Sequence, residues 1–403
     1  MASTTMESDA TGLINPRGDE DPPTVPMEKV RQMIHACSTG DMTTIQDLVQ
    51  QNTIYVAQQD WETGTSPLMA AAKVGNVALT QMLLEAGAPW NAIDRQGQCA
   101  GNYATDAEQW EVVNLLVDWG TRSELILGEL QRSQRATAET ASSWVLPDSS
   151  TKPNYLQHRL KYNDNGTALL DQDDDAVMME WERPLMQAHA QILMEAGRRV
   201  LNVGFGMGII DGILQDQYSP TLHIIIEAHP DVYQKMLADK WDQKPHVRIC
   251  HGPWQQIMPQ LIQQGVQVDA VFFDTYGEHS MDMEDFHVQM SQILSKPKGI
   301  YSFFNGLAPD NLFFHGVACQ VVKLQLSKLG FDSEFLPCQI QVNDDKVWEG
   351  IRRKYWHNRD TYYLPRVTWN QEFLGRKTKA EAEHTDMETE SEGQMKRQRR
   401  MEG

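Results

Sequence analysis

A glycine-rich turn followed by an acidic residue has the chemistry to bind a cofactor that contains a nucleoside. Gly204, Gly206 and Gly208 come directly after residues 199–203, whose apolar and β-branched character predicts a strand. Glycines let the backbone turn tightly and lie close to a ligand at the start of a helix. Glu227 ends the next predicted strand, where a carboxylate can accept hydrogen bonds from both hydroxyls of a ribose.

Two kinds of cofactor use this order of elements, the nicotinamide dinucleotides and S-adenosylmethionine. A dinucleotide fingerprint has a third glycine where this chain has Ile209, and a pyrophosphate needs positive charge, whereas residues 203–212 carry only Asp211. S-adenosylmethionine has a positive sulfonium and no phosphate. The residues therefore favour S-adenosylmethionine over a dinucleotide, and also over a glycine turn that binds no ligand.

Side chains at two further strand ends are candidates for the same site. Trp254 and Gln255 follow the predicted strand 247–250, where an indole face and an amide suit an adenine ring, although core packing explains Trp254 equally well. Asp274 follows the predicted strand 269–273, and its carboxylate either points into the mouth of the site or serves as a turn residue.

The elements that must position these residues alternate along the chain after about residue 155. The predicted strands are 199–203, 222–226, 247–250, 269–273 and 299–304, and the predicted helices are 209–217, 231–239, 254–263, 286–294 and 316–329. This alternation is typical of βαβ units on a parallel sheet. We therefore predict an α/β, doubly wound Rossmann-like domain, in which ligands bind at the carboxyl ends of the strands.

The region before this domain repeats itself. Residues 66–71 read Ser-Pro-Leu-Met-Ala-Ala, which resembles the T-P-L-H-x-A signature of ankyrin repeats with Met69 in place of the histidine. Four positions recur after 33 or 35 residues, namely Gly40, Leu48, Gly64 and Gly87, which return as Gly75, Leu83, Gly97 and Gly120. We predict an all-α domain of ankyrin-like repeats, with unrelated helical hairpins as the alternative.

Composition changes divide the chain into five segments. We expect a disordered N-terminus at 1–26, ankyrin-like repeats at 27–120, a capping helix (123–139) with a polar linker at 121–154, the α/β domain at 155–370, and a disordered charged tail at 371–403. The tail contains a basic cluster between Lys396 and Arg400, which is either a nuclear-import signal or simply solvated.

Charge and cysteine content exclude several classes of protein. The 403 residues include 35 Lys and Arg against 55 Asp and Glu, a formal charge of −20, which argues against nucleic-acid or anionic-membrane binding and favours basic partners. No apolar run approaches the roughly 20 residues of a membrane span, and the first 26 residues show no leader pattern. Five scattered cysteines without a CxxC pair predict reduced thiols of an intracellular protein and no metal site.

Three motifs make the α/β region resemble guanidinoacetate methyltransferase. Residues 181–186 read Trp-Glu-Arg-Pro-Leu-Met, residues 203–207 read Val-Gly-Phe-Gly-Met, and residues 274–276 read Asp-Thr-Tyr. That family has W-E-T-P-Y-M, E-V-G-F-G-M and Y-D-T-Y-P in the same order, and the resemblance covers roughly residues 162–365. With the ankyrin-like domain added, the whole chain resembles the fungal protein arginine N-methyltransferases that modify the internal (delta) guanidino nitrogen.

The resemblance implies a seven-stranded methyltransferase sheet and a set of site residues. Glu182 and Asp274 match the carboxylates that hold the guanidino substrate, although Arg183, Leu185 and Gly277 depart from the family's motifs. The positions that match cofactor contacts are Tyr162, Met186, Gly204, Phe205, Gly206, Met207, Gly208, Ile209, Glu227, Ala228, His229, Trp254, Gln255 and Asp274.

The resemblance also implies a function, with two alternatives left open. It implies S-adenosylmethionine-dependent methylation of the delta nitrogen of arginine in a basic protein, a ribosomal protein by analogy, in the cytoplasm and nucleus. The paired-glutamate hairpin of other protein arginine methyltransferases is not evident, since Glu180 and Glu182 are only two residues apart. The alternatives are a small-molecule guanidino methyltransferase and a non-catalytic ankyrin scaffold with a degenerate methyltransferase fold.

Overall fold

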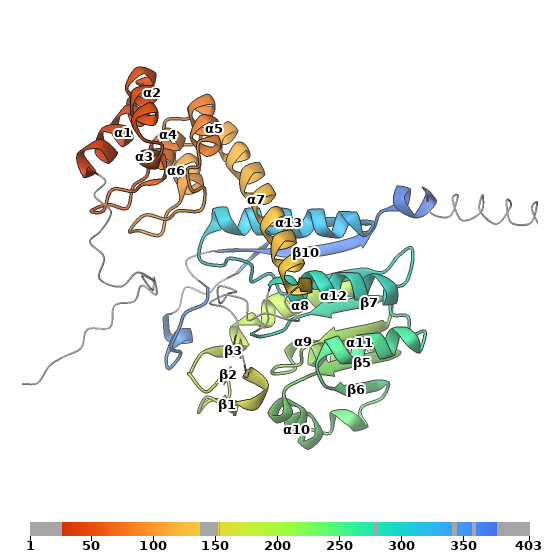
Figure 1. Cartoon of the computed structure of the whole chain (residues 1–403). Helices are drawn as coiled ribbons and strands as arrows, with labels where there is room; N and C mark the ends of the chain where they lie inside the picture. Colours follow the sequence, from red (N-terminus) through yellow and green to blue (C-terminus); the bar gives the residue numbers. More distant parts are fainter. Residues whose placement is uncertain are drawn as a thin grey trace, which may run out of the picture. The chain divides into compact units, whose positions relative to one another are not determined.

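The computed structural model describes residues 26–137, 152, 154–277, 280–340, 345–356 and 360–376. The chain separates into two compact units, Met1–Trp119 and Gly120–Gly403, which are treated one at a time below (Figure 1). The segments expected to be disordered or to act as a linker lie for the most part outside the described residues. So does the basic cluster between Lys396 and Arg400.

The first unit is built from short helix pairs. Its helices are α1 (Met27–Thr39), α2 (Met42–Gln51), α3 (Ile54–Ala57), α4 (Pro67–Lys73), α5 (Val77–Glu85), α6 (Ala100–Asp106) and the first part of α7 (Trp110–Thr137). The Ser66 hydroxyl begins α4 by accepting a hydrogen bond from the amide of Met69 at 3.2 Å. The turns before α4 and α6 lie side by side, because the Gln59 amide donates to the Ile93 carbonyl at 2.9 Å. This is the repeated helix–turn–helix arrangement that the sequence predicts.

The third repeat ends differently from our expectation. Gly120 does not form a turn there, and the predicted capping helix 123–139 is the second part of the single helix α7, which begins at Trp110. Glycine inside a helix costs only about 1 kcal/mol. Burial of Val112, Leu116 and Gly120 along one side of α7 offsets that cost, so the helix continues.

The second unit begins with a small antiparallel sheet and continues into a seven-stranded one. The small sheet is β1 (Lys161–Tyr162), β2 (Ala168–Leu170) and β3 (Ala176–Met179). The large sheet contains β4 (Arg199–Val203), β5 (Leu222–Glu227), β6 (Val247–His251), β7 (Ala270–Phe273), β8 (Ile300–Phe303), β9 (Phe331–Gln339) and β10 (Thr361–Trp369). Its helices are α8 (Arg183–Leu193), α9 (Ile209–Ile213), α10 (Pro230–Ala238), α11 (Trp254–Gln263), α12 (Ser280–Ile293) and α13 (Leu312–Lys328).

The strand order confirms the predicted α/β fold and places the site. The order is β6-β5-β4-β7-β8-β10-β9, with β6 to β8 parallel and β10 antiparallel to both of its neighbours. The chain leaves β4 toward β5 and later returns to its other side as β7. Such a topological switch point opens a crevice at the carboxyl ends of these strands, where ligands bind.

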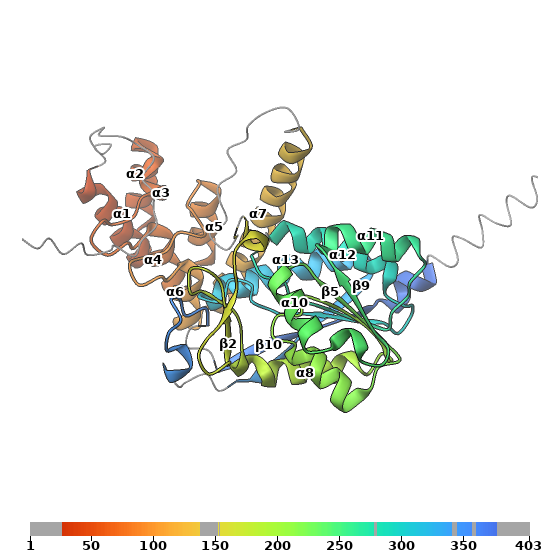
Figure 2. The same ribbon diagram turned by 90° about the horizontal axis from the view of Figure 1, so that it is seen from below.

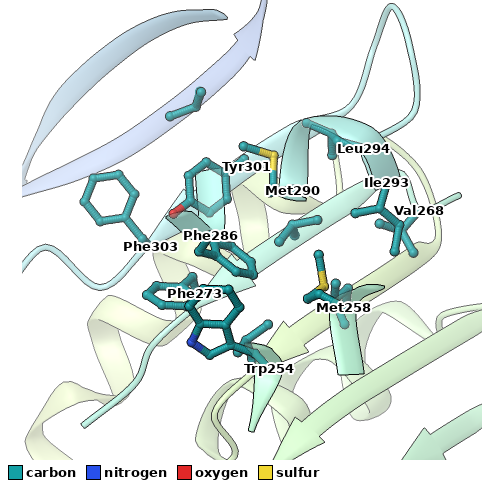
Figure 3. Close-up of a cluster of buried hydrophobic side chains, with 14 of the residues drawn as sticks. Trp254, Met258, Val268, Phe273, Phe286, Met290, Ile293, Leu294, Tyr301 and Phe303 are labelled. Carbon is teal, nitrogen blue, oxygen red and sulfur yellow. The ribbon is translucent and has the colours of Figure 1, made fainter. Parts of the chain in front are cut away.

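Helices cover both faces of the large sheet (Figure 2). Side chains of α11, α12 and α13 share one buried cluster with alternate residues of the strands, and side chains of α8 and α9 share another with the residues in between. Figure 3 shows part of the first cluster, in which the Trp254 ring packs edge-on against Phe286 with ring centroids 5.3 Å apart. The central strands β4, β5, β7 and β8 are therefore buried on both faces, as is usual for parallel strands covered by helices, whereas the edge strand β6 is partly exposed.

Three local differences from the expected elements have consequences. The helix expected at 209–217 is the short α9 followed by a π-helical turn, η4 (Leu214–Tyr218), which brings Gln215 within 2.8 Å of His223. The antiparallel strands β10 and β9, of which β9 forms the edge of the sheet, were not located in the sequence. Residues 371–376 are helical, and Phe373 contacts Gly330, so the ordered chain extends into the segment expected to be a tail.

The described residues contain neither a membrane-spanning helix nor a metal cluster. No helix there has both the length and the apolar character to cross a membrane. The same part of the chain contains no cluster of three or more His, Cys, Asp or Glu side chains arranged to hold a metal ion.

Candidate active site

A cavity of about 440 Å³ lies at the carboxyl ends of β4, β5 and β7. This volume falls in the range of small-molecule sites. The walls come from Lys152 and residues 154–157, from strand β3, from the turns after β4 and β5, from the loops after β6 and β7, and from Val232 of α10. The residues that we use below are Lys152, Tyr155, Met178, Gly204, Gly206, Glu227, Ala228, Trp254, Gln255, Asp274 and Tyr276.

The turn after β4 requires glycine for two reasons: its backbone conformation, and the lack of room for a side chain. Gly204 and Gly206 have φ angles of 93° and 55°, in the left-handed region that glycine tolerates best. A Cβ atom on Gly204 would overlap the carbonyl oxygen of Asp274, and one on Gly206 would lie 2.9 Å from the Met178 sulfur. The turn is therefore pressed against the loop that carries Asp274, which brings the two predicted parts of the site together.

Glu227 lies in the wall of the cavity and is fixed by the backbone. One carboxylate oxygen accepts a hydrogen bond from the amide of Phe205 at 2.8 Å, and the other accepts one from the amide of His229 at 2.6 Å. Burial raises the pKa of Glu227, and these amide hydrogen bonds oppose that rise. Each oxygen retains a lone pair, so the carboxylate can still accept from ribose hydroxyls.

The same contacts argue against a phosphate-containing cofactor. In dinucleotide sites the amides of the glycine turn bind the pyrophosphate. Here the Phe205 amide is taken by Glu227, a negative group that would repel a phosphate. Among the cavity-lining residues, Lys152 is the one Lys or Arg. Its ammonium lies 2.8–3.2 Å from carboxylate oxygens of Asp171, Asp173 and Asp175, so its charge is already balanced.

Asp274 lines the cavity, whereas Glu182 is buried outside the lining, near enough to Asp274 for the charge of Asp274 to affect it. Burial raises the pKa of Asp274 to about 7. Burial and then the charge of Asp274 raise the pKa of Glu182 to about 8, so the two groups sense each other. Glu182 accepts hydrogen bonds from the Met179 amide at 2.9 Å and the Tyr355 hydroxyl at 2.5 Å. The Asp274 Oδ2 atom is buried and has no hydrogen-bond partner.

Two buried carboxyls with raised pKa values are a preformed site for a cation. Leaving a buried acceptor unpaired costs free energy, and a bound donor recovers it. A guanidinium has five N–H donors in one plane and matches carboxylates through paired hydrogen bonds. The arrangement can therefore hold a guanidino group beside a cofactor bound in the cavity.

The structure does not bring all of the predicted cofactor residues into the cavity wall. Ala228, Gln255 and Trp254 are in it, although the Trp254 ring belongs to the core, which leaves little of its face for an adenine. Outside the lining lie Tyr162, Met186, Phe205, Met207, Gly208, Ile209 and His229. Their cofactor contacts, like the site as a whole, remain predictions.

The positions of these residues have simple physical reasons. The apolar side chains of Met186 and Ile209 are buried between α8, α9 and the sheet, and Phe205 packs edge-on against Trp241. The His229 ring caps α10 by accepting from the Asp231 amide, and its other nitrogen bonds the His158 carbonyl at 3.0 Å. Tyr162 is on the short strand β1 and is 38% exposed.

Sequence reasoning missed the segment 152–157, which covers part of the cavity. The Tyr155 ring packs against Tyr276 and His229, with centroids 5.1 and 4.9 Å away, and the Tyr276 hydroxyl donates to Asp171 at 3.0 Å. The segment follows a polar, Pro-containing stretch that resembles a linker. Its isolated aromatic residue, Tyr155, was the one signal that pointed to a packed segment.

Comparison with protein families gives two matches. Residues 146–315 match the model described as guanidinoacetate N-methyltransferase, and residues 33–125 match ankyrin repeats in three copies. The first match includes both candidate carboxylates, and the second includes the repeats.

Comparison with curated proteins gives relatives that span three quarters of the chain or more. The protein arginine N-methyltransferase 2 of Aspergillus oryzae is 32% identical over 399 residues, which covers 83% of this chain and 95% of the relative. The protein of the same name from Emericella nidulans is 33% identical, covering 89% and 90%. That from Yarrowia lipolytica is 32% identical, covering 75% and 82%.

Among solved structures, a complex of a predatory endopeptidase from Bdellovibrio bacteriovorus with its immunity protein shows 31% identity to a short part of the chain. The match covers 22% of this chain and 46% of the other, with a TM-score of 0.22. We draw nothing from it.

Proposed function

Because the chain belongs to the family of protein arginine N-methyltransferase 2, we propose that it methylates the internal (delta) guanidino nitrogen of an arginine in a protein substrate. The enzyme class, arginine N-methylation, follows from the family. The observation that carries the rest is the buried pair Glu182 and Asp274, with one Asp274 oxygen lacking a partner at the end of the cofactor cavity.

S-adenosylmethionine fits the cavity in size and charge. Glu227 would bind the ribose hydroxyls, Gly204 and Gly206 would allow close approach of the backbone, and Gln255 would bind the adenine edge. The charged groups of the lining are Glu227, Asp274 and the already paired Lys152. When bound, the cofactor supplies a methyl group on a positively charged sulfur, which an acidic wall tolerates and a basic wall would repel.

The two carboxylates orient the guanidino group. Methyl transfer is an in-line displacement, so the attacking nitrogen must be held in line with the bond that breaks. Glu182 and Asp274 can hold the planar guanidinium through paired hydrogen bonds, and their negative charge stabilises the positive charge that the guanidino group gains.

Asp274 is the better candidate to accept the proton that the methylated nitrogen loses. Its Oδ2 atom has no donor, whereas Glu182 already accepts two hydrogen bonds on Oε1. A free guanidinium keeps all of its protons at neutral pH. A base held against it, with a pKa raised to about 7 by burial, is matched to proton transfer near neutral pH.

The delta nitrogen and the kind of substrate are supported by two observations. The family of guanidinoacetate N-methyltransferase, which matches residues 146–315, acts on the nitrogen that carries the substituent, and the delta nitrogen of arginine is the equivalent one. The net charge of −20 favours a basic protein substrate. By resemblance we propose a ribosomal protein, and with it a cytoplasmic and nuclear location.

Labelling with radioactive cofactor tests this proposal. The protein is incubated with methyl-labelled S-adenosylmethionine and either ribosomal proteins or free guanidinoacetate, with the variant Asp274→Asn as control. We expect one labelled basic protein that depends on Asp274, and fragmentation spectra that place the methyl on the delta nitrogen. Label on a terminal nitrogen would refute the delta assignment, and label on guanidinoacetate alone would refute the protein substrate.

A further inference from the structure

The connection between β9 and β10 packs an aromatic cluster against the segment that carries Glu182. Trp181, directly before Glu182, has Trp348, Tyr355 and Trp356 of this connection around it, with ring centroids 5.8–6.1 Å away. Trp348 and Tyr355 also meet edge to face at 5.1 Å. The connection lies beyond residue 315, where the match to guanidinoacetate N-methyltransferase ends.

One polar contact joins this aromatic cluster to the candidate clamp. The Tyr355 hydroxyl donates to Glu182 Oε1 at 2.5 Å, and the Met179 amide donates to the same oxygen at 2.9 Å. Two donors on one oxygen fix the rotation of the carboxylate. They also leave Oε2 as the oxygen that Glu182 can offer to a guanidinium.

The connection is itself anchored beside the cofactor cavity. The Arg352 guanidinium makes a two-point ion pair with Asp175, 2.9 Å at its Nε, and the Arg352 amide donates to the Asp174 carbonyl at 3.0 Å. Asp175 also binds Lys152, whose segment covers the cavity. The hairpin 171–175 therefore holds both the covering segment and the segment that carries Tyr355.

We propose that Tyr355 is a positioning residue for methyl transfer, which holds the Glu182 carboxylate ready for the substrate guanidinium and is itself held in place by Arg352. The inference rests on the proposed role of Glu182 in the clamp. It adds a segment that lies beyond the guanidinoacetate N-methyltransferase match.

Removing the Tyr355 hydroxyl should raise the pKa of Glu182. Besides burial, two ionisable groups shift the pKa of Glu182: Asp274 after β7 raises it, and Tyr355 on the connection lowers it. Burial, and then the charges of Asp274 and Glu182, raise the pKa of Tyr362 on β10. The Tyr355 hydroxyl acts on Glu182 as a hydrogen-bond donor. Without it the carboxylate is harder to ionise, so a higher pH is needed before Glu182 can bind a cation.

The first test compares Tyr355→Phe with the wild-type enzyme across pH 6–10. We expect kcat/KM for the protein substrate to fall ten- to a hundredfold at pH 7, roughly the loss of one hydrogen bond to a charged group. Its acid limb should move to higher pH by about one unit, while the Kd for S-adenosylmethionine stays the same. Tyr301→Phe is the matched control, because it removes another buried hydroxyl, whose partner is His287 and not a clamp carboxylate.

A second pair of variants and a double-mutant cycle test whether Tyr355 acts through Glu182. Arg352→Gln, at an exposed side chain, should give a smaller loss with the same direction of shift, and Arg353→Gln should give none. In a Glu182→Gln background, Tyr355→Phe should add little further loss. An unmoved acid limb in Tyr355→Phe, or a loss that is equal at every pH, would overturn the inference. Near-normal turnover of Glu182→Gln would instead overturn the proposed clamp.

Discussion

The cofactor side and the substrate side of the cavity both depend on buried carboxylates, which are held in opposite ways. Each carboxylate oxygen of Glu227 accepts a hydrogen bond from a backbone amide, at 2.8 and 2.6 Å. The two donors are Phe205 in the glycine turn and His229 at the start of α10. Asp274 has a buried oxygen with no partner, and Glu182 takes one hydrogen bond from the nearby Met179 amide and a second from the Tyr355 hydroxyl, 173 residues away.

This difference in hydrogen bonding distinguishes a carboxylate that stabilises the fold from carboxyls that are available to bind a substrate. Amide hydrogen bonds satisfy Glu227, so it supports the fold as well as the ligand. Unsatisfied buried carboxyls such as Asp274 destabilise the empty protein, and a bound cation removes that cost. The four experiments below test this contrast, from the largest expected effect to the smallest.

Asp274→Asn should have the largest effect, because it removes the charge that holds the guanidinium and accepts its proton. Turnover should fall by roughly two to four powers of ten, the range for one acid–base group, while calorimetric titration shows nearly unchanged cofactor affinity. Glu182→Gln should behave in the same way, and the double variant should lose less than the product. Asp216→Asn, at an exposed carboxylate, is the control. Normal turnover of Asp274→Asn would remove the clamp from the mechanism.

Glu227→Ala should weaken both cofactor binding and the fold. Two ribose hydrogen bonds to a carboxylate are lost, for which a hundredfold rise in Kd is an order-of-magnitude expectation. The amides of Phe205 and His229 lose their acceptor, so the free energy of unfolding in urea should fall by about 1–3 kcal/mol. An unchanged Kd in the folded variant would show that Glu227 does not bind the cofactor.

Glu182→Gln should stabilise the cofactor-free protein at alkaline pH. The pKa of Glu182 is raised from 4.5 to about 8, so the folded state holds a proton more tightly than the unfolded state does. Stability from this group is therefore lost as the pH rises from about 5 to about 8, on the order of a few kcal/mol in total. Denaturant titrations at pH 6 and 9 should show a smaller pH-dependent loss in the variant. Equal losses in both proteins would contradict the raised pKa.

Lys152→Met should have the smallest effect, since it loosens only the segment over the cavity. Loss of three ion pairs at a partly buried ammonium leaves Asp171 without this cation, whereas Asp175 keeps its ion pair with Arg352. We expect the cofactor Kd to rise by about tenfold or less, because partly exposed ion pairs contribute about 1 kcal/mol or less. Lys161→Met removes an exposed ion pair with Asp174 on the same hairpin and should change nothing. Equal results for the two variants would assign the segment no role in binding.

The fold and one half of the site could be read from local patterns. The strand at 199–203, the glycine turn and Glu227 lie within about thirty residues, and each is set by neighbours in the sequence. The ankyrin-like repeats were visible for the same reason. In contrast, β9 and β10 form an antiparallel pair at one end of the sheet, which the alternation of strands and helices does not predict.

What the sequence by itself determined is the βαβ periodicity, the positions that only glycine can occupy, and the types of the two carboxylates. The tertiary structure decided which side chains meet. It turned Trp254 into the core, used His229 to cap α10, placed Tyr155 over the cavity and brought Tyr355 to Glu182. Periodicity records the preferences of neighbouring residues, whereas contacts between residues a hundred or more positions apart depend on how the elements pack, and no local pattern encodes them.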